Sequence, residues 1–357
     1  MVRLILDSSS GSYPVVIGSN IQRELRGVVS RLDPTGVAII TDSNVRPLAV
    51  KVAKSIKRAG LKTAIHVIPA SERSKSIQQL HEVLGFLERQ RIDRGGCVIA
   101  VGGGTVGDLA GFAAAVWQRG VRLVGVPTTL LAMVDSSIGG KTGIDLARGK
   151  NLAGAFHQPD AVLADPAVLG SLPRRERSSG LAEIVKSAFL VDRDSVTQIE
   201  RSVAAVLDGD LGPTLGAIAL AVDVKAGIVA TDEREAGLRE LLNFGHTLGH
   251  AYEAARRYRV THGEAVSIGL VFAAALADVL DLAPTSLRER LEALLGSAGL
   301  PTRAKLPAAT WRFLRQDKKA RAGAVRWILP RTVGRFSEVV DVAPRAIRAA
   351  TAIVEGR

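Results

Sequence analysis

The feature that most constrains the fold is an alternation of short β-rich runs with helical stretches in the first half of the chain. The β-rich runs lie at 37–40, 63–68, 97–101, 122–126 and 161–164, and helix-like segments at 46–59, 75–90 and 105–116 separate them. Regular strand–helix alternation is typical of βαβ units, which build mostly parallel sheets with helices on both faces. The first half is therefore predicted to be a Rossmann-like, doubly wound α/β domain.

The pattern changes near residue 175. Helical periodicity runs through 179–191, 213–231, 244–257, 263–281 and 285–297, and a β run returns only at 324–329. The segment LGSLPRRERSSG (169–180) between the two patterns is rich in Ser, Pro, Gly and charge, as linkers are. A chain of 357 residues is long enough for two domains. We therefore predict an α/β domain at 1–174 and an all-α domain at 175–357.

Composition indicates the type of protein and its cellular compartment. With 47% hydrophobic and 23% charged residues the chain is globular in type. Cys97 is the single cysteine, so a disulfide framework is excluded and a reducing compartment is expected. The N-terminal apolar stretch is too short for a signal peptide, and the longest apolar run, Ala265–Ala277, is shorter than the roughly 20 residues of a membrane span. We expect a cytoplasmic protein without membrane contact, and a buried helix at 265–277.

The positive charge is unevenly placed. The formal net charge is +12, but residues 301–357 alone hold 13 basic and 4 acidic side chains. Such a surplus raises nucleic acid as a partner, although no nucleic-acid-binding module is recognisable. Because arginines outnumber lysines 35 to 12, isolated lysines in polar sequence are informative. Between residues 76 and 304 the lysines are Lys141, Lys150, Lys186 and Lys225. They favour a site for a small polyanion, with a plain surface salt bridge as the alternative for Lys186 and Glu183.

A glycine-rich turn follows the β run at 97–101. In CVIAVGGGTVGDLAGF (97–112), Gly102, Gly104 and Gly107 fit the spacing G-x-G-x-x-G between a strand and a helix. Glycines let the backbone approach a phosphate, and the helix N-terminus offers N–H donors. The acidic residue expected about 20 positions later in an ordinary dinucleotide fold is missing from VGVPTTLL (124–131). The turn is predicted to cradle phosphate in a non-standard arrangement; a purely structural turn is the alternative.

Three of the six histidines lie within 17 residues. His246 and His250 are four apart on one predicted helix face, and His262 opens the next helix. Glu183 lies on an otherwise apolar helical segment and could supply a carboxylate. Two histidines and one carboxylate suit a divalent metal such as zinc with an open position. The alternative is that these are helix-surface or satisfied core histidines.

These residues lie in motifs that resemble the 3-dehydroquinate synthases of the sugar-phosphate cyclase superfamily. The resemblance extends from about Asp42 to Lys319. Its motifs are GGGTVGDLAGF (102–112), VPTTLLAMVDSSIGGKTGID (126–145), GKNLAGAFHQP (149–159), GLAEIVK (180–186), LRELLNFGHTLGHA (238–251), HGEAVSIG (262–269) and DKK (317–319). So many motifs in order make the match specific.

The resemblance implies an NAD-binding α/β domain, a helical metal-binding domain, an active site between them and a homodimer. The implied enzyme is a carbon–oxygen lyase of the shikimate pathway, acting at its second step. It converts 3-deoxy-D-arabino-heptulosonate 7-phosphate to 3-dehydroquinate and phosphate. The implied route is transient oxidation by NAD, phosphate elimination, reduction, ring opening and an intramolecular aldol reaction.

The resemblance also assigns residues. The implied zinc or cobalt ligands are Glu183, His246 and His262, so that His250 serves substrate and not metal. The implied NAD contacts are Asp42, Glu72, Lys75, Gly103, Gly104, Thr105, Val106, Gly107, Asp108, Thr128 and Thr129, with Lys141 and Lys150 near both cofactor and substrate. The implied catalytic residues are Asp135, Lys141, Lys150, Asn151, Lys186 and His250. Further implied substrate contacts are Lys225, Arg239, Asn243, Lys318 or its neighbour Lys319, and Arg119 from the partner subunit.

Two residues depart from the family pattern, and two other functions remain as alternatives to this assignment. The family usually has glycine where Ser71 precedes Glu72, which questions the shape of that loop, and Ser187 is less usual after Lys186. A sister cyclase acting on another sugar phosphate is one rival, and a metal-dependent polyol dehydrogenase is the other. The grouped lysines and Arg239 favour a substrate that carries both phosphate and carboxylate.

Overall fold

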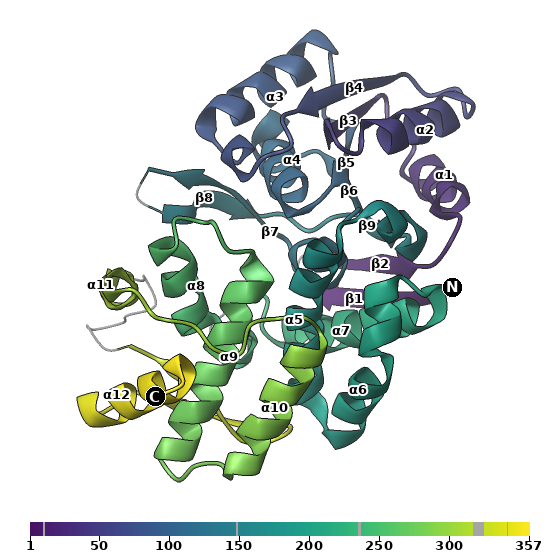
Figure 1. Ribbon diagram of the computed structural model, residues 1–357. Coiled ribbons are helices and arrows are strands. Elements are labelled where there is room, and N and C mark those ends of the chain that lie inside the picture. Colours follow the sequence, from purple (N-terminus) through teal and green to yellow (C-terminus); the bar gives the residue numbers. More distant parts are fainter. Residues whose placement is uncertain (10, 148, 235–236, 317–324, 341) are drawn as a thin grey trace. The chain divides into compact units, whose positions relative to one another are not determined.

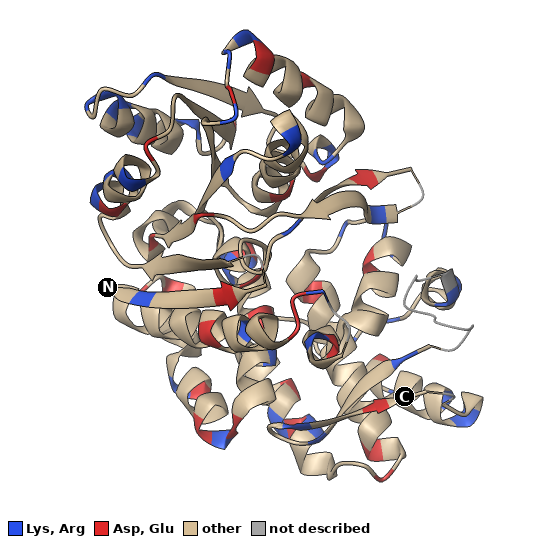
Figure 2. Ribbon diagram, turned by 180° about the vertical axis from the view of Figure 1, so that it is seen from behind, with Lys and Arg blue, Asp and Glu red and all other residues tan. Residues whose placement is uncertain are grey.

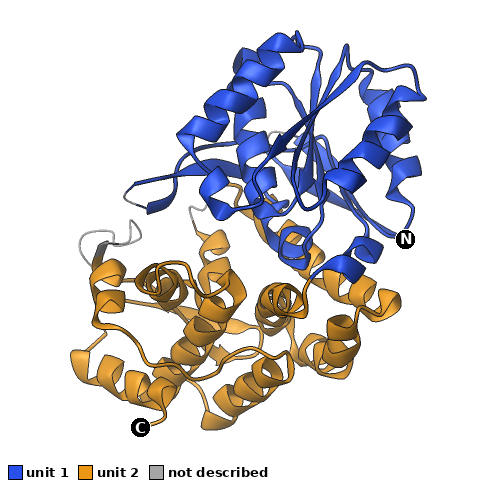
Figure 3. Cartoon of the chain, turned by 45° about the horizontal axis from the view of Figure 1, so that its top comes forward, with its two compact units in different colours: residues 1–172 blue, residues 173–357 orange. Residues whose placement is uncertain are grey.

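A computed structural model describes residues 1–9, 11–147, 149–234, 237–316, 325–340 and 342–357 (Figure 1). The chain divides into two compact units, Met1–Leu172 and Pro173–Arg357, coloured separately in Figure 3. Each unit has its own secondary-structure type, so each is described by itself.

Unit 1, within its described residues, is built on a seven-stranded sheet of order β1-β2-β9-β6-β5-β3-β4. The strands are β1 (Val2–Ser8), β2 (Gly11–Ile17), β3 (Val37–Asp42), β4 (Thr63–Ile68), β5 (Cys97–Gly102), β6 (Arg122–Pro127) and β9 (Ala161–Ala164). Pairing is parallel from β2 to β4, and only the β1–β2 hairpin is antiparallel. The predicted mostly parallel α/β sheet is confirmed, with the N-terminal hairpin as an addition.

Helices cover both faces of this sheet. They are α1 (Ile21–Leu32), α2 (Arg46–Lys57), α3 (Ile77–Arg89) and α4 (Gly104–Val116). Successive residues of a strand point to opposite faces, so Ile39 packs with α1 and α2 while Ile40 packs with α3 and α4. Both residues are fully buried, which is why the strands read as continuous apolar runs.

A second, antiparallel hairpin leaves the sheet after β6. It consists of β7 (Lys141–Leu146) and β8 (Gly149–Phe156), and the π-helical turn η3 (Ala132–Ser136) precedes it. Two facing glycines make the pairing close: a Cβ on Gly154 would lie 2.1 Å from the carbonyl oxygen of Thr142, and one on Gly143 2.7 Å from that of Ala153. These glycines read as loop in the sequence because their role is backbone contact between strands.

Unit 2 is helical, as predicted. Its helices are α5 (Arg174–Val191), α6 (Arg193–Asp208), α7 (Leu211–Thr231), α8 (His246–Ala255), α9 (His262–Val279), α10 (Thr285–Ser297), α11 (Ala308–Gln316) and α12 (Pro344–Glu355). The unit also contains the hairpin of β10 (Trp327–Thr332) and β11 (Arg335–Val339), so it is not all-α. The first strand of that hairpin overlaps the β run expected at 324–329.

Helix α9 is the central helix of unit 2. It packs against α5, α8, α10 and α12, and every residue from Ala265 to Ala277 is buried, which confirms the predicted buried helix. By length and apolar composition α7 and α9 could each cross a membrane, a weak signal that core helices also give. The most apolar window of α9 is 78% buried within the protein, as in a core helix.

Candidate functional site

In unit 1 the residues implied for NAD follow the carboxyl ends of neighbouring parallel strands. Asp42 ends β3, the turn η1 (Glu72–Ser74) follows β4, the glycine loop follows β5, and Thr128 follows β6. The strand order places β4 on one side of β3 and β5 on the other. Successive strands are therefore added in opposite directions from β3, and the switch point lies between β3 and β5. In open α/β sheets such a switch point opens a crevice at the carboxyl ends of the strands, where ligands bind.

The glycine loop is shaped by close neighbours. Gly103 is the N-cap of α4, and a Cβ on Gly104 would lie 3.0 Å from the Ser136 hydroxyl. A Cβ on Gly107 would meet no described atom within 4 Å, and Gly102, Gly103 and Gly107 line one pocket of unit 1. An open space beside a helix N-terminus with its N–H donors is a suitable cradle for a pyrophosphate.

A cluster of charged residues surrounds the start of α4. The Lys75 ammonium, only 5% exposed, donates to Asp108 Oδ2 at 2.6 Å and to the Asn151 side-chain oxygen. Glu72 accepts from the Thr105 hydroxyl at 2.6 Å, and its other oxygen lies 3.1 Å from Lys150 Nζ. The structure thus brings five of the implied cofactor residues, together with Asn151, into one network.

The network shifts the pKa values of its members. Burial raises the pKa of Asp108 to about 6 against the opposing pull of Lys75. Burial alone lowers the pKa of Lys75, but Asp108 and Glu72 outweigh it and hold the pKa above its usual value. For Glu72, burial raises the pKa, and Lys150 and Lys75 outweigh it and lower the pKa. Lys75 and Glu72 therefore stay charged at neutral pH.

Sequence reasoning missed Asp145 in this network. Asp145 Oδ1 accepts the backbone N–H of Asn151 at 2.8 Å and lies 4.0 Å from Lys75 Nζ. Asn151 has a left-handed backbone, with φ +54°, which asparagine tolerates better than most residues. Asp145 lies on β7 and Asn151 on β8, so the signal available in the sequence was only a carboxylate six residues before Asn151.

The shape of the loop at Ser71 is settled by its backbone. Ser71 is the N-cap of η1 with φ −155°, an extended conformation open to any residue, and its hydroxyl accepts the Arg73 N–H at 3.3 Å. Serine therefore fits where the family usually has glycine.

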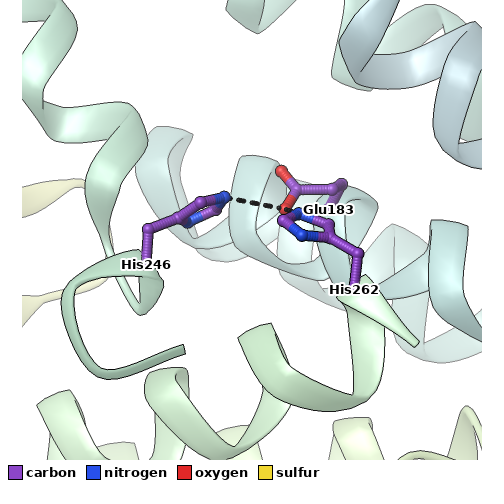
Figure 4. A group of neighbouring side chains, drawn as sticks. All are labelled: Glu183, His246 and His262. Atoms are coloured by element: carbon purple, nitrogen blue, oxygen red, sulfur yellow. Dashed lines mark ion pairs between the residues drawn. The ribbon is translucent and has the colours of Figure 1, made fainter. Parts of the chain in front are cut away.

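In unit 2, Glu183, His246 and His262 converge from three helices (Figure 4). Glu183 Oε1 lies 3.3 Å from His246 Nε2 and 3.4 Å from His262 Nε2. One ligand atom from each residue lies within 4.8 Å of the others. Close glycine packing allows this convergence, since a Cβ on Gly263 would lie 2.2 Å from the Ser179 carbonyl oxygen and one on Gly269 1.8 Å from that of Gly245.

The donor set fits a divalent metal ion. Glu183 is 2% exposed, and its Oε1 accepts no hydrogen bond from the described residues, although a buried acceptor normally has a partner. Its other oxygen is paired with Lys186 Nζ at 2.5 Å. Two imidazoles and one carboxylate oxygen, whose ligand atoms lie within 4.8 Å of one another, match the three protein ligands of catalytic zinc sites.

The pKa shifts around this cluster show how strongly its charges interact. Burial raises the pKa of Glu183, yet Lys186 and His246 outweigh it and hold the pKa well below its usual value. Burial lowers the pKa of His246. For His262, burial lowers the pKa, and the carboxylates of Glu183 and Glu253 beside its two ring nitrogens outweigh it and raise the pKa to about 10. Glu253, which sequence reasoning did not single out, is therefore part of the cluster's surroundings.

Other implied substrate residues of unit 2 lie on the segments around this cluster. His250 is exposed, with its ring centroid 5.1 Å from that of His246. The turn η5 (Leu238–Asn243) carries Arg239, 1% exposed, and leads into α8. Lys186 donates to the Leu242 carbonyl of this turn at 2.9 Å, and Lys225 on α7 is 8% exposed. Buried cations therefore accompany the metal-type cluster.

The remaining predicted residues are located as follows. Asp135 lies in the π-helical turn η3, and its charge contributes to the raised pKa of Asp108. Lys141 is exposed at the start of β7. Arg119 is exposed at the end of η2 (Trp117–Arg119), with a left-handed backbone of φ +67°. Lys318 and Lys319 lie outside the described residues.

Fold and sites together define a class: a two-unit protein with a nucleotide-type α/β unit and a helical unit with a metal-type cluster. Family models described as 3-dehydroquinate synthase N-terminal and C-terminal match residues 65–179 and 180–320. The 3-dehydroquinate synthase of Symbiobacterium thermophilum is 46% identical over 343 residues, 94% of this chain and 96% of that protein. The chain belongs to the 3-dehydroquinate synthase family.

Solved structures of related cyclases share the fold. ValA, a 2-epi-5-epi-valiolone synthase from Streptomyces hygroscopicus subsp. jinggangensis with NAD⁺ and Zn²⁺ bound, has a TM-score of 0.89 and 28% identity, covering 100% of this chain and 99% of its own. A 2-deoxy-scyllo-inosose synthase complexed with carbaglucose-6-phosphate, NAD⁺ and Co²⁺ has a TM-score of 0.90 at 24% identity, covering 99% and 100%. The predicted dehydroquinate synthase-like fold is confirmed.

Proposed function

We propose that this chain converts 3-deoxy-D-arabino-heptulosonate 7-phosphate to 3-dehydroquinate and phosphate, within the shikimate pathway. The observation that carries the proposal is the cluster of buried Glu183, buried His246 and half-buried His262, with its unsatisfied Glu183 oxygen, in a chain of this family. When bound, NAD accepts and returns a hydride, and a divalent metal, Zn²⁺ or Co²⁺, polarises a substrate oxygen.

NAD is assigned to unit 1, at the switch point between β3 and β5. The N–H groups at the start of α4 bind its phosphates, beside the open space at Gly107. Glu72 and Lys75 keep the turn after β4 attached to α4 through Thr105 and Asp108. Asp42, Thr128 and Thr129, at the ends of β3 and β6, complete the binding residues.

The metal is assigned to Glu183, His246 and His262. Each histidine points Nε2 toward Glu183 Oε1, so both rings present the same atom to the ion. Lys186 binds the second oxygen of Glu183 and orients the carboxylate. Because burial already favours neutral His246, this ligand is in its metal-binding form at neutral pH.

The substrate is an anion at both ends, and the cations of the site match it. We assign Lys186, Lys225, Arg239, Asn243 and His250 of unit 2 to substrate binding. From unit 1 we assign Asp135, Lys141, Lys150 and Asn151. Lys186, Lys225 and Arg239 are buried, where a charge interacts more strongly than in water. Phosphate leaves with its own basic oxygens, which can carry the proton removed from carbon, so a dedicated general base is not required.

The assembly and partners proposed are a homodimer in the cytoplasm, with Arg119 and Lys318 as further phosphate ligands and Arg119 supplied by the partner subunit. The exposed position of Arg119 supports that role. Neither nucleic acid nor membrane is proposed as a partner. Figure 2 supports this, since Lys and Arg are spread over helices of both units with Asp and Glu among them.

A direct assay tests the function. Purified protein is given the heptulosonate phosphate, catalytic NAD and Zn²⁺ or Co²⁺, and phosphate release and NADH absorbance are followed together. We expect stoichiometric phosphate without net NADH. Phosphate release from another sugar phosphate but not from this one would reassign the chain to a sister cyclase, and net NADH would indicate a dehydrogenase.

A further inference from the structure

A buried carboxylate near the metal-type cluster has no role in the function proposed above. Glu253 lies on α8, 5% exposed, seven residues after His246 and three after His250. At these spacings all three side chains share one face of the helix. An ionised carboxylate is rarely this buried without a specific partner.

Its partner on the neighbouring helix is His262. Glu253 Oε2 lies 3.6 Å from His262 Nδ1, while the other ring nitrogen, Nε2, lies 3.4 Å from Glu183 Oε1. The imidazole is therefore held between two carboxylates, one at each nitrogen. Glu253 is not in the group whose ligand atoms lie within 4.8 Å of one another, so it faces the ring from outside the cluster.

The second histidine repeats this arrangement with a different acceptor. His246 Nδ1 lies 3.1 Å from the Phe244 carbonyl oxygen, while Nε2 points toward Glu183 Oε1 at 3.3 Å. A ligand histidine that coordinates through Nε2 must hold its proton on Nδ1, where an acceptor fixes both tautomer and ring orientation. Both rings have such an acceptor, but only that of His262 is charged.

Charge explains why a carboxylate is useful here. Lys186 neutralises Glu183, so a divalent ion would enter a site whose two nearest charges already cancel. Each additional buried negative charge offsets part of the energetic cost of removing the ion from water. Glu253 supplies that charge without occupying a coordination position.

We propose that Glu253 is a positioning residue for the metal centre, accepting the Nδ1 proton of His262 and providing the negative charge that Lys186 cancels at Glu183. A shift of roughly half an ångström brings the 3.6 Å pair into hydrogen-bond range. The inference rests on the proposed metal site and adds a determinant of its affinity.

The test measures metal affinity and not turnover. Metal-free wild type, E253Q and E253A are titrated with Co²⁺, following the visible absorption of the bound ion, and with Zn²⁺ in competition with a chromophoric chelator. We expect the Kd to rise about 10- to 100-fold in E253A, the range typical of lost outer partners of ligand histidines. E253Q retains a hydrogen-bond acceptor and loses the charge, so its Kd should lie between those of wild type and E253A.

A matched control is E292Q. Glu292 pairs with Arg288 on α10, so this substitution also removes a partly buried ion pair of unit 2. It should leave both Kd and the Co²⁺ spectrum unchanged. Circular dichroism at the titration temperature establishes that each metal-free variant is folded. If E253A is not folded, the near-isosteric variant E253Q alone tests the role of Glu253.

The outcomes separate the two proposals. If wild type binds no metal, the proposed metal centre fails. If wild type binds metal and folded E253Q or E253A binds it with the same Kd and the same Co²⁺ spectrum, the metal centre stands and the role of Glu253 is wrong.

Discussion

The charged cluster of unit 1 and the metal-type cluster of unit 2 are both groups of acids and bases around a buried charged residue, Lys75 and Glu183 respectively. They differ in how completely their polar atoms are paired. In unit 1, Lys75 reaches Asp108 and Asn151, and Glu72 reaches Thr105 and Lys150. In unit 2, Glu183 Oε1 has no hydrogen-bond partner among the described residues, although two imidazole nitrogens lie within 3.4 Å.

The difference indicates what each cluster is for. A network whose groups satisfy one another stabilises loops around a cavity, and the ligand then binds to backbone and open space. A cluster that leaves a buried oxygen unsatisfied carries an energetic cost that a bound cation removes. NAD binding in unit 1 should therefore depend on backbone shape, and metal binding in unit 2 on the donor atoms.

The largest expected effect is loss of the metal site. H262A removes one of three ligands, so bound metal should be lost and turnover should fall about 10³-fold or more, because a metal supplies several kcal/mol of transition-state stabilisation. Metal content is measured by elemental analysis and turnover by phosphate release. H81A, an exposed histidine on α3, is the control and should retain both.

Metal binding should also raise the thermal stability of any variant that keeps all three ligands. A ligand that binds only the folded state raises the melting temperature with its concentration. Zn²⁺ should raise the melting temperature of wild type and H81A but not of H262A. Stoichiometric metal in H262A would show that the ligand set is wrong.

The next largest effect concerns two glycines of α4, one beside the proposed cofactor space and one in a packed contact. G107A places a methyl group in the open space, where no described atom lies within 4 Å, whereas G111A places one 2.4 Å from Thr142 Cγ2. G107A should keep the stability of the wild type or gain up to about 1 kcal/mol, because alanine favours helix. Its Kd for NAD should rise roughly tenfold, since a methyl forced into a fitted site costs about 1–3 kcal/mol.

G111A should show the opposite pattern, with unfolding free energy lowered by about 1–3 kcal/mol and the Kd for NAD little changed. Urea denaturation and fluorescence titration with NADH measure the two quantities. Wild-type NAD affinity in G107A would mean that the open space does not belong to the cofactor.

The sequence predicted much of this fold because its signals were local. The strands β3, β5 and β9 contain runs of four or more buried residues that are mostly apolar, and burial on both faces of the sheet demands such runs. The hairpin β7–β8 was not predicted, because Gly143 and Gly154 are required by backbone contact between strands and look like loop residues in one dimension. The N-terminal hairpin was missed because β1 is largely half-buried or exposed.

The residues of the candidate sites also divide into those that local sequence patterns predict and those that only the folded structure brings together. The glycine turn and the histidine spacing are local patterns and were recognisable. Asp145 and Glu253 act through contacts that only folding creates, across a hairpin and between two helices. Choosing His262 over His250 as the partner of His246 required the family resemblance, since helical spacing alone favoured His250; the geometry now brings His262 Nε2 to 3.4 Å from Glu183.

A smaller effect tests the electrostatics of unit 1. Asp108 should titrate with a pKa of about 6, and K75M should raise that pKa further, because Lys75 lowers it against burial. Carboxyl carbon NMR of aspartate-labelled protein measures the shift, with D108N to assign the signal. K51M, an exposed lysine on α2, is the control. An unchanged or lower pKa in K75M would contradict the network.

The same pKa has a consequence for stability. Since it is raised above the ordinary 3.8, the contribution of Asp108 to the free energy of unfolding is fully present below about pH 4 and is lost as the pH rises through about 6. D108N lacks this titration. The difference in unfolding free energy between wild type and D108N should therefore change between pH 4 and 7, when measured by urea denaturation at each pH.

The smallest effect is expected at the surface. Arg174 and Asp208 form an ion pair at 2.7 Å with side chains 60% and 64% exposed. A double-mutant cycle with R174Q and D208N should give a coupling within about 0.5 kcal/mol, abolished in 1 M NaCl, because exposed pairs are solvated and screened. The same cycle on Lys75 and Asp108, 5% and 16% exposed, should give a larger coupling that persists in salt. Equal couplings would mean that burial does not distinguish the ion pairs of the site from those of the surface.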